Sequence, residues 1–120
     1  MDADRYPKGL AEQAPLYGNE IKDNLADVPE PFNEAMPRFL TEFCFGDFYT
    51  RGGLALGERE LLVLCALATI GDTSAQLGPR GRACIQVGNS EAAVVAALVH
   101  CSPYIGFPRA DAATRAVKNL

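Results

Sequence analysis

The sequence has no tryptophan and only one histidine, and its 11 Lys and Arg residues never form a run. A nucleic-acid surface needs a basic stripe, so we expect no nucleic-acid partner. The most apolar stretches, 61–70 and 92–99, are far shorter than the roughly 20 residues that span a bilayer. The acidic start also lacks the basic and apolar segments of a secretory signal. These absences predict a cytoplasmic location and no membrane partner.

The sequence also lacks a Cys-x-x-Cys pair, although it contains four cysteines. Without that spacing, neither a thioredoxin-like redox motif nor a zinc site is supported. Each cysteine has apolar neighbours, which favours a role as a small buried hydrophobe. Cys101 is singled out because it follows the only histidine, His100.

The length and composition of the sequence suit one folded domain over residues 1–120. Of the residues, 48% are hydrophobic and 22% are charged, and the net charge is −4. These proportions are those of an ordinary globular protein and exclude a disordered or collagen-like chain. A domain of this size buries roughly two-thirds of the surface that its unfolded chain exposes. A core is therefore expected, with no room for a second large domain.

Helical periodicity runs through the sequence, and no alternation typical of strands is found. Between residues 31 and 49 the apolar residues recur at steps of three and four, with Pro37 inside the pattern, which predicts either a kink or a late start. The Gly-Pro and Gly residues of 78–81 make helix doubtful before Pro79. We predict an all-α subunit of about six helices, with helical stretches at 6–17, 20–26, 31–49, 57–70, 80–87, 91–101 and 109–120.

Two of these stretches, 57–70 and 91–101, are apolar on nearly every side. Such helices are expected to be buried centrally, and Ser90 is a suitable N-cap for the second. A chain of 120 residues has difficulty burying two such helices alone. The surplus apolar surface therefore predicts self-association.

Four motifs follow one another along most of the chain. They are Phe43-x-Phe45-Gly46-Asp47-x-Tyr49-x-Arg51-x-Gly53-Leu54, Arg59-x-Leu61-Leu62, Arg82-Ala83-Cys84-x4-Gly88 and His100-Cys101-Ser102-x-Tyr104-x-Gly106-x-Pro108. Together they resemble the γ-carboxymuconolactone decarboxylase family, part of the alkyl hydroperoxidase D-like superfamily. The resemblance implies a helical subunit that assembles as a ring-shaped homohexamer, a trimer of dimers.

The family resemblance also implies a reaction. The substrate is a small unsaturated lactone with a ring carboxylate and an acetate arm, met in the breakdown of aromatic compounds. Loss of CO2 sends electrons onto the lactone carbonyl, and the dienolate is then protonated. Because the substrate carries its own electron sink, no metal or organic cofactor is implied. The protein must supply a cationic anchor, a donor for the oxyanion and a proton donor.

Two residues are the catalytic candidates. His100 has the side chain whose ordinary pKa lies nearest neutrality, which suits proton transfer, but it can equally cap the carbonyls of a helix end. Arg80 stands where the resemblance implies the acid–base histidine. Arginine does not exchange protons near neutral pH, yet it binds carboxylates and oxyanions through its planar fork.

The other candidates would bind the substrate. Arg51 and Arg59 match family arginines and suit a dicarboxylate, although salt bridges between helices or subunits explain them equally well. Asp47 and Glu60 are possible partners that hold these arginines in place, although a glutamate in the first turn of a helix is commonly a surface residue. The hydroxyl groups of Tyr49 and Tyr104 and the thiol of Cys101 complete the set.

Two alternatives to a decarboxylase stay open. One is a non-catalytic or repurposed family member that binds a small anion, suggested by Arg80 and the altered 78–81 segment. The other is a thiol peroxidase like those of the wider superfamily, which use a Cys-x-x-Cys pair that this chain lacks. That activity would need two thiols to meet in space, for example Cys84 and Cys101.

Overall fold

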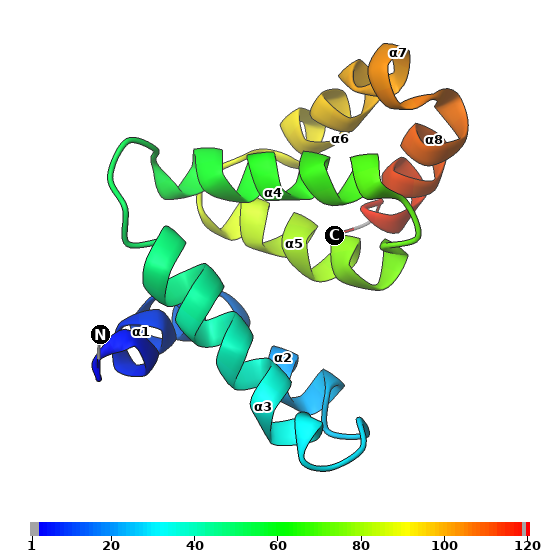
Figure 1. The fold of residues 1–120 in the computed structure, drawn as a ribbon. Coiled ribbons are helices and arrows are strands. Elements are labelled where there is room, and N and C mark those ends of the chain that lie inside the picture. The colour runs from blue at the N-terminus through cyan, green and yellow to red at the C-terminus, as the bar shows by residue number, and fades with distance from the viewer. Residues whose placement is uncertain (1–2, 119) are drawn as a thin grey trace. The chain divides into compact units, whose positions relative to one another are not determined.

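The computed structural model describes residues 3–118 and 120, and this part of the chain is helical, with no strand (Figure 1). The predicted all-α fold is thereby confirmed. Contacts between Cα atoms divide the chain into two compact units, Met1–Gly53 and Leu54–Leu120, which are described separately. The single domain over 1–120 stays a prediction, as does the ring-shaped assembly. No helix among the described residues combines the length and apolar character needed to cross a membrane.

The first unit is built on the packing of its first helix against its last helical segment. Its elements are α1 (Arg5–Tyr17), α2 (Glu20–Asn24), α3 (Phe32–Phe39) and the π-helix η1 (Leu40–Phe48). Gly9 on α1 allows the close approach, since a Cβ there would overlap the carbonyl oxygen of Thr41. The rings of Tyr17 and Tyr49 flank Phe45, with centroid distances of 5.8 and 4.5 Å, and form its aromatic core.

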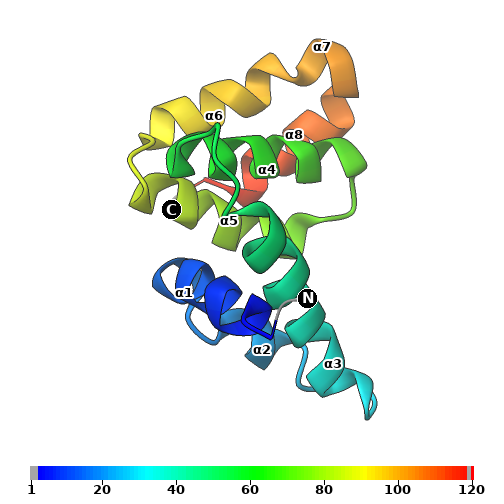
Figure 2. The ribbon, with the colours of Figure 1, turned by 60° about the vertical axis from the view of Figure 1, so that its left-hand side comes forward.

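Pro37 lies inside α3, and the helix begins before it, at Phe32. The late start is therefore not found. A proline cannot donate to the carbonyl four residues earlier. The chain continues directly from α3 into the wider turns of η1 at Leu40 (Figures 1 and 2).

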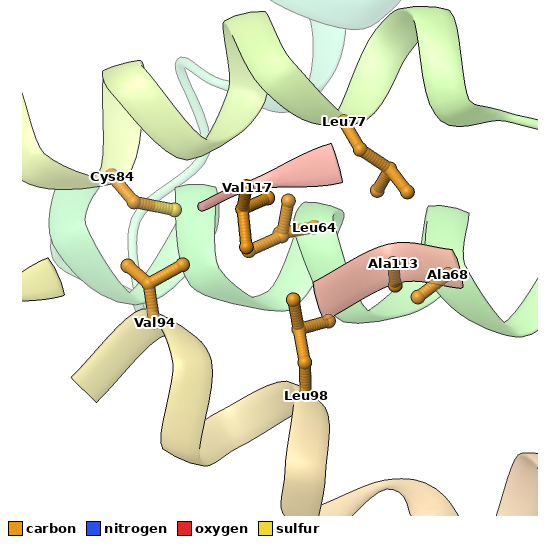
Figure 3. Close-up of a cluster of buried hydrophobic side chains, with 8 residues drawn as sticks. All are labelled: Leu64, Ala68, Leu77, Cys84, Val94, Leu98, Ala113 and Val117. Atoms are coloured by element: carbon orange, nitrogen blue, oxygen red, sulfur yellow. The ribbon is translucent and has the colours of Figure 1, made fainter. Parts of the chain in front are cut away.

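The second unit packs five helices around one core. They are α4 (Leu56–Ile70), α5 (Ser74–Gln86), α6 (Glu91–His100), α7 (Ser102–Ile105) and α8 (Phe107–Ala116). Helices α4 and α5 lie side by side in both ribbon views (Figures 1 and 2). Figure 3 shows the buried side chains that converge between the helices: Leu64, Ala68, Leu77, Cys84, Val94, Leu98, Ala113 and Val117.

Side chains and neighbouring residues cap the starts of α4 and α6. Ser90 is the N-cap of α6, as predicted, and its Oγ accepts a hydrogen bond from the backbone N–H of Ala93 at 3.0 Å. Helix α4 begins one residue before the predicted Gly57, and Glu58 accepts a hydrogen bond from the N–H of Ala55 at 2.8 Å. Both contacts satisfy N–H groups that a helix start leaves without a partner.

Two predictions for this unit are wrong. Helix was doubted before Pro79, yet α5 begins at Ser74 and contains that proline. Burial of Leu77 on one side of the proline and Cys84 on the other stabilises the continuous helix. Helices α4 and α6 were also expected to be buried all round, but Leu62 on α4 is 58% exposed. A unit with one core buries one face of each helix, and the opposite apolar face stays outside.

Candidate functional site

A charged pair lies between α4 and α5. The Nη1 atom of Arg80 is 3.6 Å from Oε1 of Glu60, with side-chain exposures of 14% and 0%. Both were predicted site residues, and the structure brings them together. The interpretation of Glu60 as a surface residue of the first helical turn is wrong, because its carboxylate is fully buried.

Helical spacing explains the burial of Glu60. It lies four and eight residues before Leu64 and Ala68, so all three share the face of α4 that is buried in the core. On α5, Arg80 lies between the buried residues Leu77 and Cys84. A buried carboxylate is stable only beside a counter-charge, and the guanidinium supplies it.

The thiol of Cys84 lies in the electrostatic field of this pair. Its pKa is raised to about 11, chiefly by burial and then by the negative charge of Glu60, while Arg80 acts in the opposite direction. The thiol is therefore protonated at neutral pH and is a poor nucleophile. Its role is that of a core side chain, as Figure 3 also shows.

Two further cysteines meet in this unit. The pKa of Cys65 on α4 is raised to about 12, chiefly by burial and then by the charge of Cys101 and a hydrogen bond with its sulfur. Cys84 contributes more weakly to the same shift. The sequence gives no sign of this arrangement, since these residues are 17 or more positions apart.

His100 ends α6 and is exposed. Its ring centroid lies 6.4 Å from that of Tyr104, which is 81% exposed. The two predicted site residues are thus neighbours at the surface of the second unit. His100 occupies the end of α6, where a positive charge is favoured, and this position suits the capping role. The catalytic role and the capping role both stay predictions.

The remaining predicted residues of the first unit surround a different ion pair. Asp47 accepts two hydrogen bonds from Arg5, from Nε at 3.0 Å and from Nη2 at 2.7 Å. The predicted partner of Asp47, Arg51, instead donates from Nε to its backbone carbonyl at 3.2 Å. Tyr49 is 8% exposed and packs on Phe45, so its ring belongs to the core.

Sequence reasoning missed the role of Arg5, which lies 42 positions before its partner. The sequence around Arg5 contains no pattern that indicates an ion pair with a residue as distant as Asp47. Arg59 lies beside Glu60 on α4 and is partly buried. Within the second unit, then, the structure joins Glu60 with Arg80 and places Cys101 against Cys65.

Comparisons with known proteins identify the family of this chain. Residues 34–119 match the model of the carboxymuconolactone decarboxylase family, so the chain belongs to that family. It is 28% identical over 112 residues to the 4-carboxymuconolactone decarboxylase of Acinetobacter baylyi, covering 93% of this chain and 83% of the relative. It is also 28% identical over 104 residues to the nitrosuccinic acid decarboxylase npaB of Metarhizium robertsii, covering 86% and 71% respectively.

Proposed function

We propose that this protein is a cofactor-independent lyase that removes CO2 from a small dicarboxylic acid carrying an electron-withdrawing group. The observation that carries the proposal is the pair of Arg80 with the buried Glu60 at 3.6 Å. It holds a permanent cation, partly open to solvent, in an environment of low polarity. There a guanidinium stabilises a developing negative charge much more than it would in water.

The names of the two relatives support the class of substrate. One relative is named for 4-carboxymuconolactone and the other for nitrosuccinic acid. Both compounds are dicarboxylic acids, and each has an electron sink of its own, a conjugated lactone in the first and a nitro group in the second. A substrate of this class keeps one carboxylate after the other is lost, which leaves an anionic group for binding.

The reaction needs only groups that this chain contains. The bond between the departing carboxylate and its carbon breaks, CO2 leaves, and the electron pair passes to the lactone or nitro oxygen. Arg80 stabilises that oxygen. Arg59 is the proposed anchor of the retained carboxylate, because a planar guanidinium binds a carboxylate through two parallel hydrogen bonds. His100 then protonates the carbanionic carbon.

An ultraviolet assay with 4-carboxymuconolactone and a CO2-release assay with nitrosuccinate test the proposal. The unmodified protein is expected to turn over at least one of them. Arg80→Gln is expected to lower kcat by about 10²- to 10³-fold, the size of a lost oxyanion donor. Arg115→Gln is the matched control, since this arginine forms an exposed pair with Asp111 within α8.

Each further outcome has a definite meaning. Lower kcat in His100→Gln supports its role in proton transfer. Activity that appears only in Arg80→His contradicts the proposal and identifies a scaffold that has lost its original chemistry. A lack of turnover of either acid by both the unmodified protein and Arg80→His also contradicts the proposal.

The charged pair also favours a second candidate, an anion-binding protein without turnover. Arg80 stands where the resemblance implies a titratable histidine, and arginine keeps its proton near neutral pH. Saturable binding of either acid, weakened by Arg80→Gln and unaccompanied by CO2 release, would establish this function instead.

We further propose that the protein acts in the cytoplasm as a homo-oligomer, a hexamer built as a trimer of dimers. Large apolar side chains on α3 and η1 support self-association, because Phe32, Met36, Phe39 and Phe43 are 44–61% exposed and recur at steps of three and four. Light scattering after gel filtration is expected to give six chains. Phe39→Glu is expected to reduce the mass, and a monomeric unmodified protein would contradict the proposal.

A further inference from the structure

The first unit contains a cleft that the proposed decarboxylation does not use. Its volume is about 460 Å³, within the range of about 300–1,000 Å³ that is typical of small-molecule pockets. The lining residues come from the helices labelled α1, α2 and α3 in Figure 2, from the start of η1 and from the segments that connect them. All of them belong to the unit Met1–Gly53, and the described lining contains neither Glu60 nor Arg80.

The floor of the cleft consists of the buried lining residues Gln13, Pro37 and Thr41, and it contains an amide with one free end. Gln13 is 4% exposed, and its Oε1 accepts a hydrogen bond from Oγ1 of Thr41 at 2.6 Å. Among residues 3–118 and 120, no group accepts a hydrogen bond from Nε2 of Gln13. A buried N–H group without a partner costs free energy, so the floor favours a ligand that places a hydrogen-bond acceptor there.

The mouth of the cleft, formed by its exposed lining residues, carries charges of both signs. Lys22 on α2 and Glu34 on α3 line it, and neither forms an ion pair within the described part of the chain. Arg38 also lines the mouth, but its charge is balanced by Glu42, since Nε lies 3.4 Å from Oε2. Its guanidinium covers the ring of Tyr6, 4.8 Å from the centroid. The mouth thus offers one cation and one anion, which suits a ligand that carries one charge of each sign.

Apolar side chains make up much of the remaining lining. Leu10 and Ala35 lie on α1 and α3, and Pro37 is part of the floor. Methylene groups of a ligand would be removed from water against these side chains, at about 0.8 kcal/mol for each group that is fully buried. The lining therefore favours a hydrocarbon segment that joins the charged end of a ligand to its acceptor.

The proposed self-association uses a different face of α3. Its apolar stripe contains Phe32, Met36 and Phe39. Glu34 and Arg38 each lie two positions from Met36, which places them about half a turn around the helix from it. The stripe on α3 can therefore be covered by another chain while the mouth of the cleft stays open.

We propose that this cleft binds a free α-amino acid whose uncharged side chain ends in a hydrogen-bond acceptor, as in glutamine. The α-carboxylate binds Lys22, the ammonium group binds Glu34, and the side-chain carbonyl accepts a hydrogen bond from Nε2 of Gln13. Each of these three protein groups then has a partner on the ligand. A simple anion or a simple cation would leave one charge of the mouth unmatched. The proposal does not depend on the decarboxylase activity, because no bond is formed or broken in the cleft.

Isothermal titration of the full chain with L-glutamine tests the proposal, and saturable binding of one molecule per chain is expected. L-norleucine has a side chain of the same length without the acceptor, and it should bind about 3- to 10-fold more weakly, the effect of one hydrogen bond. Glutaramate lacks the ammonium group, and 4-aminobutanamide lacks the α-carboxylate. Each should bind about 2- to 5-fold more weakly than glutamine, because the charges of the mouth are exposed to solvent. These comparisons use the unmodified protein.

Variants then locate the bound amino acid. Lys22→Gln and Glu34→Gln are each expected to weaken glutamine binding about 2- to 5-fold. Lys8→Gln is the matched control, since Lys8 is an exposed lysine of α1 that does not line the cleft. Arg59→Gln alters the proposed decarboxylase site and should leave glutamine binding unchanged.

Gln13→Glu tests the floor, because it keeps an oxygen for the hydroxyl of Thr41 and removes the amide donor. Glutamine should then bind no better than norleucine. If this variant fails to fold, the comparison of the two ligands on the unmodified protein decides the point. Lack of saturable glutamine binding, equal affinity of the unmodified protein for norleucine, or weakening by Arg59→Gln instead of Lys22→Gln would overturn the proposal. Absence of decarboxylation with glutamine still bound would contradict only the proposed function.

Discussion

The guanidinium of Arg80 and the carboxylate of Glu60 face each other between α4 and α5 at 3.6 Å, and the glutamate is wholly buried. The pair has two consequences. It holds a cation beside the buried side chains of the core. It also makes the free energy of unfolding of the second unit depend on both partners. Removal of Arg80 takes away the guanidinium that faces the buried carboxylate of Glu60.

Arg80→Ala should therefore destabilise the protein more than removal of both charges does. We expect a loss of about 3–5 kcal/mol in the free energy of unfolding for the single variant, since the buried carboxylate of Glu60 would lose the guanidinium that lies 3.6 Å from it. The double variant Glu60→Gln/Arg80→Gln should lose less. Urea unfolding measures both, with Arg115→Ala expected to change stability by at most about 0.5 kcal/mol. Equal losses in the single and double variants would contradict this account.

Gly9→Ala should destabilise the first unit. A Cβ at this position would overlap the backbone carbonyl of Thr41, which cannot move aside as a flexible side chain does. Overpacking of this kind costs about 1–3 kcal/mol, measurable by thermal or urea unfolding. The matched control is Gly52→Ala, where a Cβ would meet nothing within 4 Å. Similar effects of the two substitutions would show that α1 and η1 separate easily.

Asp47→Asn should weaken the same unit more mildly. The carboxylate accepts two hydrogen bonds from Arg5, but each side chain is 32% exposed, so solvent screens the pair. A loss of about 0.5–1 kcal/mol is expected, and it should shrink at high salt. Unfolding in low and high salt measures the difference. In Arg5→Gln the substitution of Asp47 should have almost no further effect, and a full additional loss would contradict the pairing.

Stability should fall at alkaline pH because of the buried thiols. The pKa values of Cys65 and Cys84 rise from 9.0 to about 12 and about 11 in the folded protein. Above pH 9 the unfolded chain releases these protons while the folded chain keeps them, so alkali favours unfolding. The contribution is complete below pH 9 and disappears as the pH rises through 11 and 12.

Urea unfolding between pH 8 and pH 10.5 measures this dependence. Lysine and tyrosine side chains also titrate in this range, so the comparison is with Cys65→Ala/Cys84→Ala. The slope of stability against pH should be shallower in that variant. An identical slope in both proteins would mean that the thiols do not contribute.

The sequence by itself determined most of the helices and the class of the fold. The apolar steps between residues 31 and 49 and the cap at Ser90 are local signals, and the structure agrees with both. The family motifs also depend only on residue order, and they identified the family correctly. Local spacing failed at Pro79, because burial of side chains on both sides of the proline outweighs its poor helix propensity.

Only the tertiary structure decided which residues meet. Glu60 reads as a first-turn surface residue until the packing of α5 on α4 buries it against Arg80. Cys65 and Cys101 read as isolated apolar residues until α4 and the end of α6 bring their sulfurs together. Arg5 and Asp47 are joined only by the crossing of α1 and η1. Helix periodicity specifies which face of a helix is buried, while the partner on the facing helix depends on packing between segments distant in sequence.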